Sequence, residues 1–106
     1  MKLLFLCSQN RWRSLTAEKV LHGVDGYEVR SSGTENNARI KVTSGHIGWV
    51  DVIFVMEKKH LRRIQEKYGE MLNDKKVIVL GITDDYRFMD EDLIEMLKCR
   101  VAKYFE

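Results

Sequence analysis

Four short runs of apolar residues recur along the chain and predict four β-strands. They cover 2–6, 27–31, 51–55 and 76–80. Every position of 3–6 and 52–55 is apolar, which is typical of strands buried on both faces of a parallel sheet. The run 27–31 instead alternates Tyr27 and Val29 with polar residues, which predicts an edge strand.

The segments between these runs show helical patterns. Leu15, Val20 and Leu21 give an apolar side to a helix after the first strand, whereas Gly45 and Gly48 predict only weak helix in the second connection. Further helices are predicted over 57–68 and 90–105, with the apolar stripes Leu61, Ile64 and Tyr68, and Leu93, Leu97, Val101 and Tyr104. This alternation of strand and helix predicts an α/β sandwich built from βαβ units.

Length, charge and cysteine content limit the classes of protein to which the chain can belong. A chain of 106 residues suits one domain, 1–106, and a net charge of +2 is too small to indicate a nucleic-acid or membrane partner. No apolar run reaches membrane-spanning length, and the start of the chain lacks the pattern of a signal peptide. Cys7 and Cys99 are too few for a disulfide scaffold, which favours a cytoplasmic location.

The predicted sheet indicates where a site belongs. Ligands of such sheets bind beyond the carboxyl ends of the strands. Cys7 follows the first strand, Glu57 the third and the segment 81–88 the fourth. We therefore expect these three parts of the chain to meet at one edge of the sheet.

Cys7 opens a loop that leads into a helix near Ser14. Backbone N–H groups in such a loop form an anion-binding nest, and the helix dipole adds positive potential. This environment stabilises a thiolate as well as a phosphate. Arg13 returns to the mouth of the loop, where its planar guanidinium can bind a phosphate through two parallel hydrogen bonds.

The residues C-S-Q-N-R-W-R-S at 7–14 match C-x5-R-S and resemble the phosphate loop of the low-molecular-weight protein tyrosine phosphatases. The likeness continues through L-T-A-E at 15–18, S-S-G-T at 31–34, D-V-I-F-V-M-E-K-K-H-L-R-R-I at 51–64 and D-D-Y at 84–86. It implies a three-layer sandwich around a four-stranded parallel sheet in the order 2-1-3-4. It also implies a phosphatase that uses no cofactor or metal and acts on a phosphorylated protein or a small aryl phosphate, releasing inorganic phosphate.

The resemblance implies roles for single residues. Cys7 is the expected nucleophile, Arg13 the phosphate clamp and Asp84 the general acid. Tyr86 is expected to wall the substrate pocket and Arg11 to lie at its lip. The expected phosphate-binding loop comprises Ser8, Gln9, Asn10, Arg11, Trp12, Arg13 and Ser14, in which Ser14 donates to the thiolate and Asn10 props the loop open in a left-handed conformation.

Some positions depart from the family pattern. Asp85 stands where the family's D-P-Y has proline, so the acid is Asp84 or Asp85. Trp12 either packs on the first helix or takes part in the pocket. The segment between S-S-G-T and D-V-I-F-V, which normally helps to wall the pocket, is short here.

Other functions stay open at this point. A phosphocarrier subunit of the sugar phosphotransferase system would need neither Arg13 nor a late acid, and an arsenate reductase would need further cysteines, whereas Cys99 is predicted to face the surface. A phosphate-binding module without turnover is a third candidate. The segment 58–63 is predicted to be a solvated helix face, and the histidines, which lack metal-ligand spacing, are predicted to be structural: His22, His46 and His60.

Overall fold

The computed structural model describes residues 1–105 and contains the predicted parallel sheet. Four strands lie in the order β2-β1-β3-β4, and every neighbouring pair is parallel. The strands are β1 (Lys2–Cys7), β2 (Glu28–Gly33), β3 (Val52–Val55) and β4 (Lys76–Val79). The apolar runs therefore predicted each strand to within two residues at either end, and β2 lies at an edge as its alternating pattern indicated.

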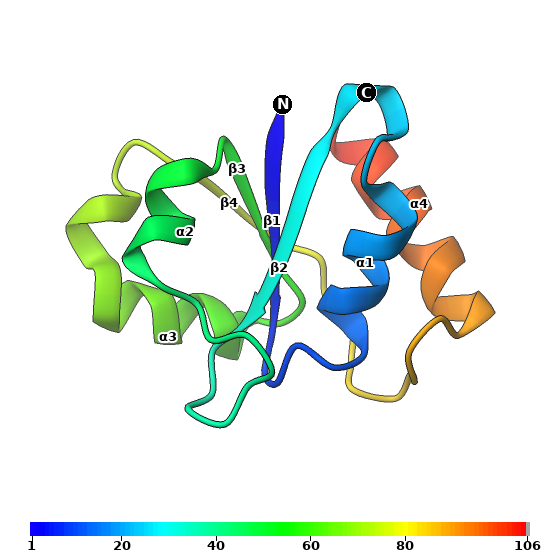
Figure 1. Cartoon of the computed structure of the whole chain (residues 1–106), viewed down its shortest axis with the longest axis horizontal. Helices are drawn as coiled ribbons and strands as arrows, with labels where there is room; N and C mark the ends of the chain where they lie inside the picture. The colour runs from blue at the N-terminus through cyan, green and yellow to red at the C-terminus, as the bar shows by residue number, and fades with distance from the viewer. Residues whose placement is uncertain (106) are drawn as a thin grey trace.

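Helices cover both faces of the sheet and complete the three layers (Figure 1). α1 and α4 pack on one face, and α2 and α3 lie on the other. Their bounds are α1 (Arg13–Leu21), α2 (Ser44–Trp49), α3 (Lys58–Tyr68) and α4 (Glu91–Tyr104), with short 3-10 turns η1 (Val24–Gly26) and η2 (Gly69–Leu72). In residues 1–105, no helix is both long enough and apolar enough to cross a membrane.

The central strands β1 and β3 form the core because their side chains are buried on both faces of the sheet. Phe5 of β1 stacks on Phe54 of β3 with ring centroids 5.0 Å apart, and both side chains are fully buried. Successive residues of β1 and β3 point to opposite faces of the sheet and so belong to two different apolar clusters. One cluster lies beneath α1 and α4, and the other lies beneath α2 and α3. The most uniformly apolar runs thus occupy the middle of the sheet, as predicted.

The apolar stripes predicted for α3 and α4 are confirmed, whereas the stripe predicted for α1 is partly wrong. Leu93, Leu97 and Val101 of α4 are buried, and Cys99 is exposed on the opposite side, as predicted. In α1, however, Leu15 is only half-buried. Helix α1 buries mainly small and polar side chains instead, namely Arg13, Ser14, Thr16 and Ala17, together with Leu21. Its first turn is directed at the loop that follows β1 rather than at the apolar core.

Candidate active site

A pocket of about 570 Å³ lies at the carboxyl edge of the sheet, where the segments that follow β1, β2 and β4 meet. The loop between β1 and α1 runs beneath this edge of the sheet, close to the start of α3 and the segment after β4 (Figure 1). The pocket is lined by Cys7, Ser8, Gln9, Arg11, Trp12, Arg13, Glu35, Asn37 and Asp84. The segments after β1 and β4 therefore meet as predicted, and Glu57, after β3, joins them through its hydrogen bond with Arg13.

The Cys7 sulfur has two hydrogen-bond partners. Cys7 is 3% exposed, and its Sγ is 3.0 Å from Ser14 Oγ and 3.3 Å from the backbone N of Asn10. Asn10 has a φ of 57°, the left-handed conformation that the sequence predicted. Its Nδ2 donates to Ser14 Oγ and to Ser31 Oγ, each at 2.8 Å, so the Asn10 side chain ties the loop to the end of β2.

A second loop, residues 34–39, contacts the outer side of the expected phosphate-binding loop through backbone hydrogen bonds. The carbonyl oxygens of residues 7, 8 and 9 accept hydrogen bonds from the backbone N–H groups of Thr34, Glu35 and Arg39 at 2.9–3.0 Å. The carbonyl of Asn10 accepts from Arg39 Nε at 3.1 Å. Because C=O and N–H point in opposite directions across a trans peptide, carbonyls fixed outward direct the intervening N–H groups inward. No local pattern in the sequence predicts this contact.

Gly33 allows the two loops to approach so closely. A Cβ atom at this position would lie 2.6 Å from the carbonyl oxygen of Ser8 and 2.6 Å from the Cβ of Ala38. Both distances are shorter than van der Waals contact, so any side chain at position 33 would force the loops apart.

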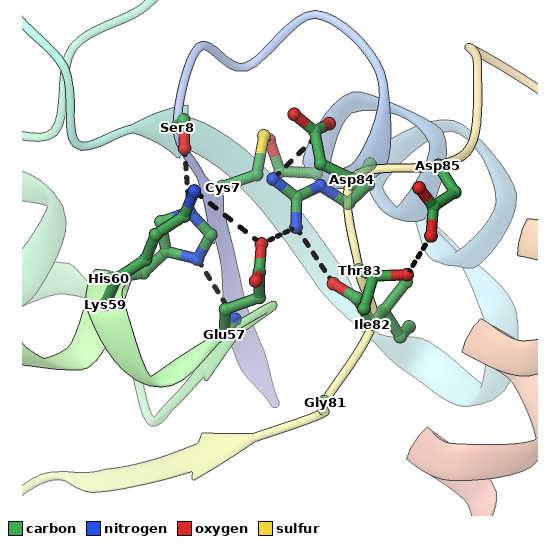
Figure 2. A network of polar contacts seen from close by, with 12 residues as sticks. Cys7, Ser8, Glu57, Lys59, His60, Gly81, Ile82, Thr83, Asp84 and Asp85 are labelled. Atoms are coloured by element: carbon green, nitrogen blue, oxygen red, sulfur yellow. Dashed lines mark hydrogen bonds and ion pairs between the residues drawn. The ribbon is translucent and has the colours of Figure 1, made fainter.

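Arg13 is anchored along one edge of its guanidinium. The side chain is 2% exposed, and its Nη1 donates to Glu57 Oε1 at 2.6 Å and to the carbonyl of Ile82 at 2.9 Å. Nη2 lies 3.6 Å from Asp84 Oδ1. Figure 2 shows these three partners of Arg13, namely Glu57, Ile82 and Asp84, gathered near Cys7. The Nε–Nη2 edge is thereby left to bind two oxygens of a tetrahedral anion in parallel.

Glu57 and His60, at the start of α3, belong to the same polar network (Figure 2). His60 is 1% exposed; its Nδ1 accepts from the backbone N of Glu57 at 3.0 Å, and its Nε2 lies 3.0 Å from Ser8 Oγ. The prediction of a solvated face over 58–63 is therefore wrong for His60, although its charged neighbours are exposed. The contact resembles one half of a capping box, but the sequence pattern of that motif has Ser or Thr at the N-cap and Glu or Gln three residues later, so E-x-x-H gave no such signal.

The charges around this network shift two pKa values. Burial raises the pKa of Glu57, but the hydrogen bond and the positive charge of Arg13 outweigh that effect and lower the pKa overall. Burial, together with the Arg13 charge, lowers the pKa of His60 to about 4, against the opposing attraction of Glu57. Glu57 is therefore a carboxylate and His60 a neutral imidazole at neutral pH.

The two aspartates after β4 are placed differently. Asp84 lines the pocket beside Arg13, whereas Asp85 Oδ2 accepts from Thr83 Oγ1 at 2.6 Å and lies outside the pocket lining. Tyr86, predicted to wall the pocket, does not line it. Its side chain packs against the core, and its hydroxyl lies 4.0 Å from the Met96 sulfur of α4.

The remaining predicted loop residues divide into two groups. Gln9, Arg11 and Trp12 line the pocket, and Trp12 is 45% exposed there, so it does not simply pack on α1. Asn10 and Ser14 are fully buried behind Cys7 and are absent from the lining. Among the unexpected lining residues, Glu35 and Asn37 show that the short segment after β2 still supplies one wall.

Known structures share this fold across almost the whole chain. The low-molecular-weight protein tyrosine phosphatase SP-PTP from Streptococcus pyogenes matches with a TM-score of 0.78 and 17% identity, covering 98% of this chain and 90% of that one. The tyrosine phosphatase Wzb from Escherichia coli K30, solved in complex with phosphate, gives 0.77 and 22%, covering 97% and 94%. The YwlE arginine phosphatase from Geobacillus stearothermophilus gives 0.72 and 19%, covering 98% and 92%.

These likenesses establish the fold of low-molecular-weight protein tyrosine phosphatases, including the predicted strand order 2-1-3-4. A scan of protein-family models found no match to this chain, and a search of the curated proteins found none either.

Proposed function

We propose that this protein hydrolyses phosphate monoesters through a cysteinyl-phosphate intermediate on Cys7, with phosphotyrosine as the preferred class of substrate. The observation that carries the proposal is the juxtaposition at the pocket. The Cys7 sulfur accepts from the Asn10 N–H and contacts the Ser14 hydroxyl, which can donate to a thiolate, and Arg13 lines the same pocket with one edge of its guanidinium available. Such an arrangement can hold a phosphate directly above a nucleophile.

The chemistry follows in two balanced steps. The Cys7 thiolate attacks phosphorus, the bond from phosphorus to the phenolic oxygen breaks, and protonated Asp84 transfers its proton to the departing oxygen. The Asp84 carboxylate then takes a proton from a water molecule, whose oxygen attacks phosphorus and breaks the S–P bond. Inorganic phosphate leaves and the thiolate is restored. Arg13 and the inward-facing amides stabilise the equatorial oxygens in both steps.

The pocket wall favours an aromatic leaving group. Trp12 is an exposed aromatic side chain that lines the pocket, so its ring can stack against the ring of phosphotyrosine. In this proposal Trp12 has the role of pocket wall that the resemblance implied for Tyr86. The solved structures named for tyrosine phosphatase activity share the fold, which agrees with this substrate class.

Phosphoarginine is a second candidate because of Glu35. This carboxylate lines the same pocket and would attract the guanidinium of a phosphorylated arginine. One of the proteins with the same fold is an arginine phosphatase.

An arsenate reductase and a phosphocarrier have less support from the site. Cys99, the second cysteine that a reductase would need nearby, is exposed on α4 rather than at the pocket. A phosphocarrier would have no use for Asp84, which lines the pocket beside Arg13.

The decisive experiment is steady-state hydrolysis of p-nitrophenyl phosphate with EDTA present and no metal added. We expect turnover by the wild-type protein and none by Cys7→Ser, which should still bind inorganic phosphate because the loop amides and Arg13 remain. Turnover by Cys7→Ser at the wild-type rate, or a strict requirement for metal, would contradict the proposal. Phosphotyrosine and phosphoarginine peptides, compared by kcat/KM, then separate the two substrate classes.

The same assay identifies the acid. Asp84→Asn should slow phenyl phosphate, which has the poorer leaving group, far more than p-nitrophenyl phosphate, by about 10²-fold or more. Asp85→Asn is the matched control, since its carboxylate bonds Thr83 outside the pocket. If Asp85→Asn alone shows the leaving-group effect, Asp85 is the acid.

A further inference from the structure

The side chain of Ser8 is held by a residue that lies 52 positions later in the chain. Ser8 lines the pocket, and its Oγ lies 3.0 Å from Nε2 of His60. Figure 2 shows the imidazole between Ser8 on one side and the Glu57 backbone on the other. His60 thus connects the wall of the phosphate pocket to the first turn of α3.

Hydrogen-bond directions fix the tautomer of His60. Its Nδ1 accepts the backbone N–H of Glu57 at 3.0 Å, so this nitrogen carries a lone pair and no hydrogen. In the neutral imidazole the hydrogen must then lie on Nε2, and the contact to Ser8 is a donation from Nε2–H to Oγ. The low pKa of His60 agrees with this neutral form.

The direction of this bond determines what Ser8 can do. Because its oxygen accepts from His60, its own hydroxyl hydrogen remains to be donated elsewhere. Within residues 1–105, Ser8 Oγ has no other hydrogen-bond partner. The Ser8 O–H is therefore free to donate into the pocket. The expected ligand, phosphate, has several oxygen atoms that can accept this hydrogen bond.

We propose that the Ser8 hydroxyl is a side-chain ligand of the bound phosphate and that His60 is the positioning residue that orients it. For its effect on turnover the inference rests on the proposed phosphatase function; for phosphate binding it stands on the geometry alone. The same helix start supports the pocket twice, since Glu57 holds Arg13 and His60 holds Ser8.

Substitutions at both residues can separate the donor from the helix cap. Ser8→Ala removes the hydroxyl, and Ser8→Thr restores one. In His60→Asn, the amide oxygen can replace Nδ1 as the acceptor for the Glu57 N–H, but the side chain is too short to reach Ser8. In His60→Gln, the amide NH₂ can replace Nε2–H. His46→Asn is the matched control, because His46 caps α2 through the same Nδ1 contact, to Thr43 N at 3.1 Å, away from the pocket.

Affinity for inorganic phosphate, measured by calorimetry, is the main readout, and kcat and KM on p-nitrophenyl phosphate are the second. Ser8→Ala and His60→Asn should each weaken phosphate binding about tenfold, as expected for one hydrogen bond to a charged group. The double variant should be no weaker than either single variant. Ser8→Thr and His60→Gln should recover most of the affinity, and His46→Asn should bind as the wild type does.

Wild-type affinity in Ser8→Ala would overturn the inference, and so would additive losses in the double variant. Should His60→Asn fail to fold, Ser8→Ala with its Ser8→Thr rescue still decides the role of the hydroxyl, and His60→Gln decides that of the donor. Phosphate binding that depends on Ser8 in a protein without turnover would refute the proposed function and leave the phosphate ligand standing. A wild-type protein that binds no phosphate would refute both.

Discussion

Helices α2 and α3 begin with the same capping contact from a histidine, but their N-cap side chains bond to different partners. In each, a histidine three residues after the N-cap turns back and accepts the N-cap backbone N–H through Nδ1, at 3.1 Å for His46 and 3.0 Å for His60. At α2 the side chain of the N-cap Thr43 also bonds to its own helix, since Thr43 Oγ1 accepts from the backbone N of His46. At α3 the carboxylate of the N-cap Glu57 reaches Arg13 instead.

Position in the sheet explains the difference. α3 follows the central strand β3, which lies next to β1, so its first turn abuts the loop that carries Cys7. α2 follows the edge strand β2 and begins in an exposed segment, where His46 is only half-buried. The same capping pattern therefore becomes part of the candidate site only where the topology places it beside the loop that carries Cys7.

The largest contrast should come from the arginine that each helix contacts. Arg13 is bonded to the N-cap of α3, and Arg30 lies over the ring of Trp49 in α2, 4.1 Å from its centroid. Arg13→Lys keeps the charge but loses the planar fork, so turnover should fall by about 10²-fold or more. Arg30→Lys should leave turnover unchanged. Equal effects in an aryl phosphate assay would contradict the assignment of Arg13 as the phosphate clamp.

Removing the N-cap side chain should lower the free energy of unfolding more at α3 than at α2. Glu57→Ala leaves the Arg13 guanidinium buried without its carboxylate partner, and we expect it to lower the free energy of unfolding by about 3 kcal/mol. Thr43→Ala removes only a helix cap and should cost about 1 kcal/mol. Urea denaturation at pH 7 measures both. A Glu57→Ala variant no less stable than Thr43→Ala would show that the ion pair adds nothing beyond capping.

The stability of the fold should fall in mild acid because of His60. Its folded-state pKa of about 4 lies below the ordinary value of 6.5, so the unfolded chain binds a proton in this window that the native state does not. The free energy of unfolding should therefore drop by about 1.5 kcal/mol between pH 6.5 and 5. Burial and the positive charges of Arg13 and Lys59 oppose protonation, and Glu57 favours it.

Substitution of the two capping histidines isolates this contribution. His60→Asn should remove most of the pH dependence between pH 6.5 and 5. The pKa of His46 is also lowered, by burial and then by the charge of Arg30, so His46→Asn should change the slope in the same direction. Because His46 is less buried, its effect should be the smaller one. Urea midpoints at several pH values provide the measurement, and an unchanged slope in His60→Asn would refute the assignment.

A last contrast concerns two glycines, Gly33 at the end of β2 and Gly48 within α2. Gly33→Ala should destabilise the fold by about 1–3 kcal/mol and weaken phosphate binding, because the new methyl group meets the Ser8 carbonyl. Gly48 lies within α2, and a Cβ atom there would meet nothing within 4 Å, so Gly48→Ala should stabilise the protein by about 0.5–1 kcal/mol. Thermal unfolding distinguishes the opposite signs. A neutral Gly33→Ala would mean that the two loops can separate without loss.

The sequence determined the fold and the ends of its strands. Apolar runs placed β1 and β3 in the middle of the sheet, and the alternation in β2 placed it at an edge. These features follow from local patterns, because the side chains of a strand report directly which of its faces are buried. The pattern C-x5-R-S also brought Cys7, Arg13 and Ser14 together, since a short loop between a strand and a helix leaves few arrangements of its residues.

Only the tertiary structure decided how this loop is supported. The bonds from 34–39 to the loop carbonyls, from Glu57 to Arg13 and from His60 to Ser8 join parts of the chain that have no common periodicity. Tyr86 likewise faces Met96 of α4, although its position after Asp84 suggested the pocket. Such contacts depend on which strands are neighbours and on which polar groups are buried together, and both are fixed only when the layers pack. The expected nucleophile can therefore be recognised in the sequence, whereas the residues that orient the phosphate loop around it are a property of the folded chain.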